Sequence, residues 1–532
     1  MLISAFSRHN VGRFITVGHK SSGDKHSHMI SLDKYALIKR GSIEARDYQI
    51  NIAAEVGDKN SLVILPTGLG KTVIASLILA STLQRRGGKA LFLAPTRIIV
   101  QQHKDFLVRV MNLPADSVVS LTGEDDLVAR GDAWQSKIIC ATPQITLQDF
   151  KRKMFDPSKF SIVIFDEVHR ATGNHSYVSL AQVFADDNIQ KVGMTATLPT
   201  DKQKIDEIRS ALRAEAVLYR DYLSSDVQPF VQKVYVETKV LEPPEYMDRA
   251  IKLIKGSISE KMSLLEEAGY ISKEAVKRLS FKEVLGKRDS ILGQGNWNHR
   301  FAYLFCAKTF TLLKYLETQT FASFLNYYSK SIGGGSRVSN MISRDARISQ
   351  SVSLISDAVK RGEEHPKLLA LKSMITALSN SDRVLIFAGY RETVDQIYNT
   401  LSATGIRAWI LIGKQGETGQ TQDEQVKAVE DFRKGNYQVL IATQIGEEGL
   451  DIAECNIVLF YDNVPSAIRY IQRRGRTGRR SPGRMIVLMV KGTSDEAYHW
   501  IVQRRLGGMR RLANKLNEET KREAKGTLDS FV

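Results

Sequence analysis

The glycine-rich segment at residues 66–72 constrains the fold more than any other part of the sequence. It reads Pro66-Thr67-Gly68-Leu69-Gly70-Lys71-Thr72, follows an apolar run at residues 62–65 and opens a helical pattern. Glycines let backbone N–H groups approach phosphate oxygens, and a helix N-terminus favours negative charge. In such a loop the lysine reaches the β and γ phosphates of ATP, and the threonine hydroxyl faces Mg²⁺. This order predicts an α/β domain that binds ATP with Mg²⁺, although Leu65 replaces the usual first glycine and a chance glycine turn is the alternative.

Short β-branched runs alternate with helical patterns in two separate parts of the chain, at residues 62–65, 90–93 and 162–165 and again at residues 383–388, 438–442 and 457–461. This rhythm predicts two α/β domains, each with a parallel sheet and crossover helices. Between them, apolar residues step by three and four along one helix face: Met247, Ile251, Ile254, Ile258, Met262 and Leu265. We expect the first α/β domain at 29–225, an all-helical insertion at 226–365, the second α/β domain at 366–503 and a basic tail at 504–532.

The 532 residues carry a formal net charge of +17, with a pI of about 9.5. Lys and Arg that neutralise phosphates release counterions, so the charge indicates a nucleic-acid partner, although a merely soluble basic surface has the same composition. Part of the charge lies in the insertion, at Lys273, Lys277, Arg278, Lys282, Lys287 and Arg288. A solvated helix surface explains these residues without a function. We favour a basic arm that grips nucleic acid, because the insertion separates the two α/β domains.

The cysteines and the hydropathy of the sequence limit which cellular environments fit this protein. Cys140, Cys306 and Cys455 lie far apart without a Cys-x-x-Cys pair, which argues against a disulfide framework or zinc site and favours a reducing compartment. No apolar run approaches the roughly 18 to 20 residues of a membrane span. Residues 1–28 are rich in Ser, His and Lys. We expect a disordered leader or a true start at Met29, with a transit peptide as the alternative, and a cytoplasmic, nucleoid-associated protein.

Two adjacent carboxylates, Asp166 and Glu167, follow the apolar run at residues 162–165. Loops after parallel strands share one edge of the sheet, so this pair faces the same phosphates as the glycine-rich segment. Asp166 would hold Mg²⁺ through water, and Glu167 would orient and deprotonate the attacking water. An Asp-Glu pair after a strand is also typical of a solvated surface or a helix cap. Its position downstream of the glycine loop favours the catalytic role.

The second α/β domain contributes the cationic run Gln472-Arg473-Arg474-Gly475-Arg476-Thr477-Gly478-Arg479. We expect Gln472, Arg476 and Arg479 to complete the catalytic set across a closed cleft. Arginines that stabilise charge on the transferring phosphoryl group are worth about 10³ to 10⁵ in rate. Hydrolysis would then depend on closure of the two domains. A cluster that contacts only DNA is the alternative.

Together these motifs resemble the superfamily 2 helicases of the DExH type, and the resemblance spans both α/β domains. It implies two RecA-like parallel-sheet domains with a thumb-like helical insertion. The resemblance assigns further residues to three roles: adenine recognition by Arg46 and Gln49, coupling of hydrolysis to domain movement by Thr195 and Thr197, and nucleotide contact by Gly449 and Asp451. It also assigns contacts with the nucleic-acid track to Thr96, Arg97, Thr122, Gly123, Thr142, Pro143 and Thr443. Such phosphate contacts carry no sequence information, so we expect little sequence preference.

Within the superfamily, residues 166–174 and 465–479 are most similar to the archaeal Hef helicase and its eukaryotic relative, the Fanconi anaemia M protein. The stretch His365-Pro366-Lys367 after the insertion fits the same family. That family remodels stalled forks and Holliday junctions with 3′ to 5′ polarity, so the resemblance implies an ATP-dependent DNA helicase or translocase. The Hef chain continues into an XPF-type nuclease. This sequence has no Glu-Arg-Lys nuclease signature, and we expect no nuclease activity.

Residues 525–532 look like a sliding-clamp (PCNA) binding box, with Leu528 and Phe531 as apolar plugs on one face of a helical turn. Lys525 replaces the usual glutamine and Val532 the second aromatic residue, so an inert tail is the alternative.

Two other functions stay open at this point. One is a double-stranded RNA-activated ATPase that resembles RIG-I-like receptors or Dicer. The other is a basic nucleic-acid-binding scaffold with an inactive ATP site. Retention of Lys71, Glu167, Arg476 and Arg479 argues against the scaffold.

Overall fold

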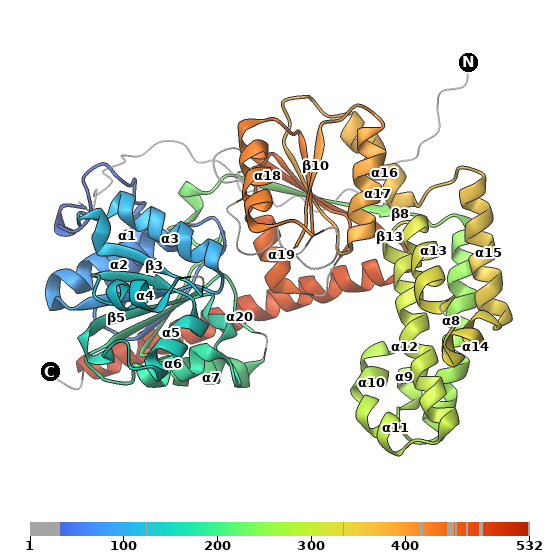
Figure 1. The fold of residues 1–532 in the computed structure, drawn as a ribbon, viewed down its shortest axis with the longest axis horizontal. Coiled ribbons are helices and arrows are strands. Elements are labelled where there is room, and N and C mark those ends of the chain that lie inside the picture. Colours follow the sequence, from blue (N-terminus) through green and yellow to red (C-terminus); the bar gives the residue numbers. More distant parts are fainter. Residues whose placement is uncertain are drawn as a thin grey trace.

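The computed structural model describes residues 32–123, 125–199, 201–333, 335–413, 419–443, 452, 455–463, 466–477 and 482–529, without the side chains of 33, 467, 468 and 521–529. Two α/β domains lie side by side, and a helical insertion projects from the second domain (Figure 1). Within these ranges no helix is long and apolar enough to cross a membrane. The leader expected at residues 1–28 lies outside them.

The first domain is a seven-stranded sheet in the order β3-β4-β2-β5-β6-β1-β7, with every pair parallel. Its strands are β1 (Ser61–Ile64), β2 (Lys89–Leu93), β3 (Val118–Leu121), β4 (Ile138–Ala141), β5 (Phe160–Asp166), β6 (Gln190–Thr195) and β7 (Ala216–Tyr219). Its helices are α1 (Asp47–Val56), α2 (Lys71–Arg86), α3 (Arg97–Val110), α4 (Leu127–Ala133), α5 (Pro143–Lys151), α6 (Ser176–Val183) and α7 (Lys202–Leu212). Alternate side chains of β1 point to opposite faces, so Val63 packs among α1 to α3 and Leu62 among α5 to α7. Two-sided burial explains why these strands read as continuous apolar runs.

The second domain is a six-stranded parallel sheet in the order β10-β11-β9-β12-β13-β8. Its strands are β8 (Val234–Leu241), β9 (Val384–Phe387), β10 (Ala408–Leu411), β11 (Val439–Ala442), β12 (Ile457–Phe460) and β13 (Gly483–Val490). Its helices are α16 (Pro366–Thr376), α17 (Arg391–Ser402), α18 (Gln422–Lys434), α19 (Ala467–Arg474) and the start of α20 (Ser494–Asp529). The two sheets and the helices between them confirm the predicted pair of RecA-like domains.

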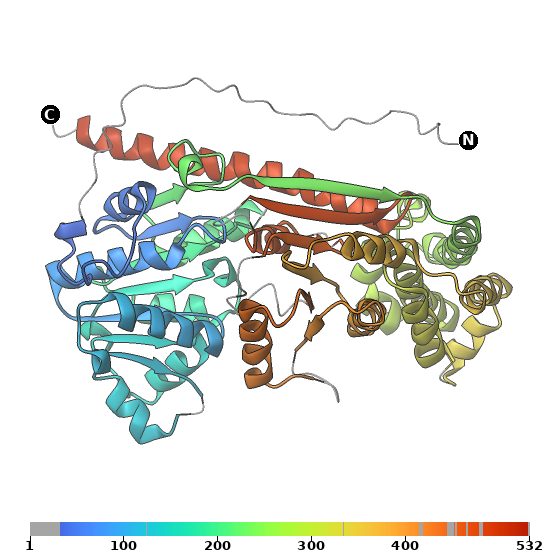
Figure 2. The ribbon, with the colours of Figure 1, turned by 90° about the horizontal axis from the view of Figure 1, so that it is seen from above.

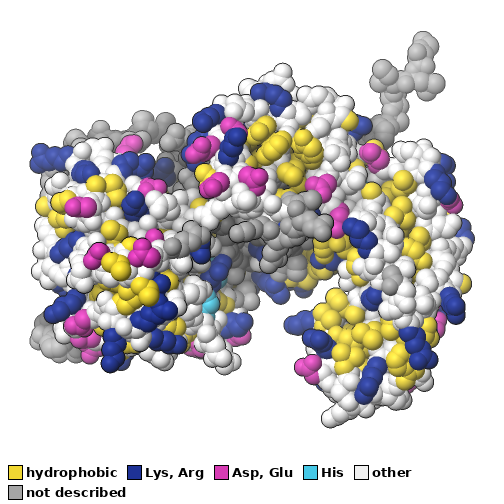
Figure 3. All heavy atoms as spheres, in the orientation of Figure 1, with side chains coloured by type: hydrophobic (Ala, Val, Ile, Leu, Met, Phe, Trp, Pro, Cys, Tyr) yellow, Lys and Arg dark blue, Asp and Glu magenta, His cyan; other side chains and the backbone are white. Residues whose placement is uncertain are grey.

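The insertion consists of α8 (Glu245–Glu267), α9 (Lys273–Lys277), α10 (Phe281–Gly286), α11 (Arg288–Gln294), α12 (Trp297–Thr318), α13 (Phe321–Tyr327), α14 (Arg337–Ser343) and α15 (Ala346–Lys360). The apolar face predicted from Met247 to Leu265 is buried in its core, as the helical spacing requires. The free end carries α9, α10 and α11, and Lys and Arg side chains surround an apolar patch there (Figure 3).

One boundary of the predicted insertion is wrong. Residues 234–241, which we assigned to the helical segment at 226–365, form β8 at the edge of the second sheet and pair with β13 along eight residues. Val234, Val236, Thr238 and Val240 alternate with period two, which is the pattern of a strand and not of a helix. The chain therefore crosses to the second domain before it enters the insertion (Figure 2).

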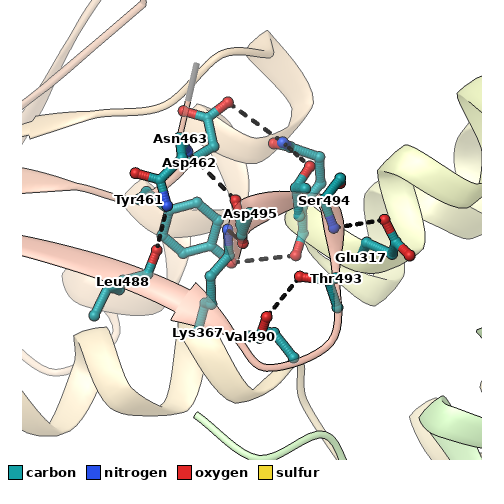
Figure 4. A network of polar contacts seen from close by, with 12 residues as sticks. Glu317, Lys367, Tyr461, Asp462, Asn463, Leu488, Val490, Thr493, Ser494 and Asp495 are labelled. Carbon is teal, nitrogen blue, oxygen red and sulfur yellow. Dashed lines mark hydrogen bonds and ion pairs between the residues drawn. The ribbon is translucent and has the colours of Figure 1, made fainter. Parts of the chain in front are cut away.

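A buried polar network joins the insertion, the second sheet and the start of α20 (Figure 4). Lys367 Nζ lies 2.6 Å from Asp495 Oδ2, and both side chains are fully buried. The backbone N–H of Ser494 donates to Glu317 of α12 at 3.0 Å. The ion pair lies within the second domain, between α16 and α20, and the Ser494 hydrogen bond to Glu317 connects it to the insertion.

Helix α20 links the two α/β domains. Near its start, Val502 packs in the core of the second domain, whereas Ala513 and Leu516 are buried in the core of the first. Arg510 Nε pairs with Asp221 Oδ2 after β7 at 3.0 Å. Figures 1 and 2 both show the helix passing along the two domains. Residues 504–520 of the segment expected as a tail are therefore part of one continuous helix, and they carry an apolar face that the first domain covers.

Candidate active site

The carboxyl edge of the first sheet gathers the residues that the sequence assigns to ATP. The glycine loop follows β1, Asp166 ends β5, and Thr195 ends β6. Strands β5, β6 and β1 are neighbours in the sheet. Parallel strands end at one edge, so sheet order alone brings the three segments together.

The glycine loop turns sharply into α2. Gly68 and Gly70 have φ angles of 88° and 78°, in the left-handed region that favours glycine. A Cβ at Gly70 would overlap the side-chain amide of Gln49. Lys71 begins α2, and its Nζ donates to the Leu65 carbonyl at 3.4 Å. The loop thus presents the N-terminus of a long helix, the usual geometry for a phosphate.

Gln49 and Arg46, the expected adenine readers, brace the glycine loop. Gln49 Nε2 donates to the Leu69 carbonyl at 3.0 Å, and Gln49 Oε1 accepts the Arg46 N–H at 2.9 Å. The Arg46 guanidinium donates to the Phe230 carbonyl at 3.1 Å and lies over that ring. Tyr48 also donates to Leu69, at 2.7 Å. These contacts tie α1 to the loop that we expect to face the phosphates.

Asp166 is held from several sides. Its Oδ1 accepts the Glu167 N–H at 3.0 Å, and its Oδ2 lies 3.0 Å from Nε2 of His103. The Tyr177 hydroxyl donates to its carbonyl at 2.7 Å. Burial alone would raise the pKa of Asp166, but the His103 hydrogen bond and charge, Lys71 and the Glu167 N–H outweigh it and hold the pKa below its usual value. Asp166 is therefore ionised, and its carboxylate oxygens are of the kind that bind a metal ion.

Glu167 has a strained backbone and connects to the coupling segment. Its φ of 51° is left-handed, which is uncommon for a residue with a side chain. His169 Nδ1 lies 3.2 Å from Glu167 Oε2 and 3.0 Å from Thr195 Oγ1. Thr195 Oγ1 donates its proton to the Thr197 carbonyl at 2.8 Å, so the imidazole N–H is the donor in the contact with Thr195. The expected base and the expected coupling residues therefore share one histidine.

The second domain meets the glycine loop directly. A Cβ at Gly475, just after α19, would lie 2.6 Å from Thr67 Cβ, so the two domains touch at this point. Arg474 lies over the Tyr222 ring at 4.7 Å, and Tyr222 donates to the Thr67 carbonyl at 2.8 Å. Gln472 and Arg476 are buried beside this contact region. Arg479, Gly449 and Asp451 lie outside the described residues.

A pocket of 180 Å³ lies between the two domains beside the glycine loop. Both domains and α20 line it, with side chains that include Pro66, Thr197, Tyr222, Ile471, Arg474 and Met509. The domain boundary at the site is therefore partly open.

The expected track contacts occupy the other half of the same sheet edge. Thr96, Thr122 and Thr142 follow β2, β3 and β4 respectively. Thr96 caps α3, and Pro143 is the first residue of α5. A side chain added at Gly123 would begin 3.5 Å from the Arg97 guanidinium, so these two residues are adjacent. In the second sheet, Thr443 follows β11.

Three features of the site were not found from the sequence. His103 contacts Asp166 but lies outside the short motifs, six residues after Arg97. Tyr222 touches the glycine loop from a segment without regular pattern. The packing of α20 against the first domain is long-range, and only the apolar spacing of Met509, Ala513 and Leu516 hints at it.

Two family profiles match the chain: the DEAD/DEAH box helicase domain at residues 46–205 and the helicase conserved C-terminal domain at residues 366–481. The crystal structure of the Pyrococcus furiosus Hef helicase domain superposes with a TM-score of 0.69 at 36% sequence identity, covering 87% of this chain and 99% of that one. The chain belongs to the Hef family of superfamily 2 helicases. Hef-type helicases are ATP-dependent enzymes that act on nucleic acid.

Full-length relatives of this Hef-type chain differ in their names. A Methanocaldococcus jannaschii protein named as an ATP-dependent RNA helicase is 35% identical over 475 residues, which are 88% of this chain and 60% of that protein. The ATP-dependent DNA helicase mph1 of Neurospora crassa is 27% identical over 485 residues, 85% of this chain and 42% of that protein. The chain thus spans roughly half of the length of these relatives.

Proposed function

We propose that this chain is an ATP-dependent DNA helicase or translocase that remodels branched DNA, such as stalled forks and Holliday junctions, with 3′ to 5′ polarity. The observation that carries the proposal is the divided edge of the first sheet. The half formed by β5, β6 and β1 carries the ATP motifs, and the half formed by β3, β4 and β2 carries the track motifs. In this proposal, ATP turnover and contact with the nucleic-acid strand would be neighbours on one sheet.

The side chains at this edge of the sheet fit the binding of Mg²⁺ and ATP. Asp166 is an ionised carboxylate, and the Thr72 hydroxyl lies in the first turn of α2, so both offer the hard oxygen ligands that Mg²⁺ prefers. When bound, Mg²⁺ would neutralise charge on the phosphate oxygens. Lys71 and the N–H groups of the glycine loop would hold the phosphates, and Glu167 would orient the attacking water and accept its proton.

The second domain would complete the site on closure. Gln472 and Arg476 lie beside the contact between Gly475 and the glycine loop, and Arg479 follows three residues after Arg476. Arginines brought to the γ phosphate from another domain make hydrolysis conditional on closure. Thr195 and Thr197 would couple this step to domain movement through His169.

The insertion supports a DNA grip. Six basic side chains in or beside α9, α10 and α11, the helices at its free end (Figure 1), are all exposed: Lys273, Lys277, Arg278, Lys282, Lys287 and Arg288. Basic side chains at a projecting end can neutralise phosphates of a second duplex arm, which a branched substrate offers. DNA is the proposed track because the fungal relatives at up to 29% identity are named DNA helicases.

RNA is the second candidate track, because the Methanocaldococcus relative is named an RNA helicase. The ATPase rate with forked DNA, single-stranded DNA or double-stranded RNA distinguishes a DNA track from an RNA track. The variants Lys71→Ala and Glu167→Gln are measured beside the wild type. We expect the strongest stimulation by forked DNA and loss of turnover in both variants. Stimulation by RNA alone overturns the DNA assignment, and turnover at the wild-type rate in both variants overturns the site.

A sliding clamp is a further proposed partner, through the box with Leu528 and Phe531. The side chain of Leu528 and all of Phe531 lie outside the described residues. Calorimetry with a peptide of residues 518–532 and the clamp tests the proposal. No heat at high micromolar concentration contradicts it.

A further inference from the structure

Helix α3 connects the two halves of the functional edge. It begins at Arg97, with three residues between it and the end of β2, and its cap is Thr96, so its N-terminus carries two of the expected track contacts. Strand β2 is the neighbour of β5, and β5 ends at Asp166. An α-helix repeats every 3.6 residues, so a residue about two turns into α3 can face the end of β5.

His103 occupies that position and is 7% exposed. Its Nε2 lies 3.0 Å from Asp166 Oδ2, and its ring stacks on Phe92 of β2 with centroids 4.2 Å apart and planes 29° apart. The stacking fixes the plane of the imidazole. The adjacent Gln101 and Asp105 are exposed and hydrogen-bond to each other, so they do not face the site.

We propose that His103 is the positioning residue that fixes the Asp166 carboxylate and links it to the track-contacting end of α3. The inference rests on the proposed function, because it assigns the track to Thr96 and Arg97 and the metal to Asp166.

The hydrogen-bond geometry explains how His103 positions the carboxylate. The last torsion of an aspartate is broad, so one contact leaves the two oxygens free to rotate. Oδ1 accepts the Glu167 N–H and Oδ2 accepts the His103 Nε2–H, and together these bonds set the carboxylate plane. The orientation of a metal-binding carboxylate depends on such outer partners, whose loss typically costs about 10- to 100-fold in metal affinity or activity.

The contact between His103 and Asp166 also connects the expected track-binding end of α3 to the proposed metal ligand. A nucleic acid that shifts the N-terminus of α3 also shifts His103, because hydrogen bonds make the helix move as a unit. The shift changes the bond to Asp166 within one helix length, without any movement of the second domain. His103 therefore makes metal binding at Asp166 sensitive to whether the track is occupied.

Two substitutions separate the hydrogen bond from the packing. His103→Phe keeps a ring that can stack on Phe92 but loses the N–H donor. His103→Gln keeps an N–H donor of similar reach. Asp105→Asn, on the exposed face of the same helix, is the matched control.

The first readout is Mn²⁺ affinity by electron paramagnetic resonance, with a non-hydrolysable ATP analogue and with or without forked DNA. We expect His103→Phe to weaken Mn²⁺ binding by about 10- to 100-fold and to remove the effect of DNA on it. His103→Gln should recover most of the Mn²⁺ affinity and most of the effect of DNA on it, and Asp105→Asn should behave as wild type. Affinity for DNA measured without metal and nucleotide should stay within about twofold in all three, because none of these side chains belongs to the expected track contacts, and any coupling between metal and DNA is reciprocal.

The second readout is ATP turnover against Mg²⁺ concentration. We expect His103→Phe to lower the DNA-stimulated kcat and to raise the half-saturating Mg²⁺ concentration. Wild-type Mn²⁺ affinity in His103→Phe overturns the inference. If His103→Phe does not fold, His103→Met replaces it. If both of these variants fail to fold while His103→Gln folds, His103 contributes to stability and the positioning role is overturned. A wild-type protein without DNA stimulation contradicts the proposed function, whereas normal stimulation with unaltered variants contradicts only this inference.

Discussion

At the residue scale, Gly70 shows why a phosphate loop needs glycine for two separate reasons. Its φ of 78° strains any other residue, and a Cβ there would overlap the Gln49 amide that braces the loop. Gly87 has a similar φ of 69° but no atom within 4 Å of its would-be Cβ. The two positions therefore separate backbone strain from a steric clash.

We predict that Gly70→Ala loses binding of an ATP analogue by more than about tenfold, whereas Gly87→Ala costs about 1 kcal/mol of stability through strain alone. Fluorescent nucleotide titration and thermal unfolding of both variants measure the two effects. Equal nucleotide affinity in the two variants contradicts the role of Gln49 as the brace of the loop.

His365 gives a pH dependence with a definite sign. Burial, and then the charge of Lys367, lower its pKa from 6.5 to about 3. Its Nδ1 accepts the Lys367 N–H at 3.2 Å and its Nε2–H donates to the Leu316 carbonyl at 3.2 Å, so the folded protein needs the neutral ring. The unfolded chain binds the proton first as pH falls below 6.5. Stability from this group is therefore complete above that pH and is lost on acidification.

We predict a loss of about 2 kcal/mol from this group between about pH 7.5 and about pH 5. His365→Asn keeps an N-cap acceptor for α16 but does not titrate, so its unfolding free energy should fall less over the same range. Urea unfolding of the two proteins at both pH values gives the difference. An identical pH dependence contradicts the neutral buried imidazole.

At the element scale, the ion pair of Lys367 and Asp495 joins the first turn of α16 to the first turn of α20. Removal of one partner leaves an unpaired buried charge, which costs about 3 to 5 kcal/mol. We predict that cost for Lys367→Met and a smaller one for the double variant Lys367→Met with Asp495→Leu. Denaturant unfolding of the three proteins forms the test, and a double variant as unstable as the single one contradicts it.

The helices and strands differ in how far the sequence alone could predict them. Parallel strands buried on both faces appear in the sequence as apolar runs, so the sheets could be predicted. The motifs in the loops after β1 and β5 stand in adjacent residues, so the sequence could place them at one edge of the sheet, and their roles stay predictions. The period-two alternation of β8 was a local signal of a strand, but its place in the second sheet could not be predicted, because its partner β13 lies about 250 residues later. His103 was missed because its contact with Asp166 depends on β2 lying beside β5, which only the sheet order reveals.

At the scale of the whole molecule, α20 limits how far the two domains can separate. It starts in the second domain and buries Ala513 and Leu516 in the first. We predict that Ala513→Asp, which places an unpaired charge in that core, frees the end of α20 and makes it accessible to protease. Asn514→Asp adds the same charge at an exposed neighbour and is the control.

Limited proteolysis and the ATPase rate with forked DNA measure the effect. We expect faster cleavage within α20 and a lower stimulated rate for Ala513→Asp, since the domains lose one of their connections. Cleavage at the wild-type rate contradicts the packing of α20 as a link.

In the proposed ATP site, residues of both domains act together, and Arg476 is the decisive residue to change because it lies outside the domain that holds the glycine loop. Single-turnover hydrolysis by Arg476→Ala with forked DNA should fall by about 10³-fold or more, while affinity for an ATP analogue stays within about threefold of wild type. Hydrolysis within about tenfold of wild type would contradict a site completed by the second domain.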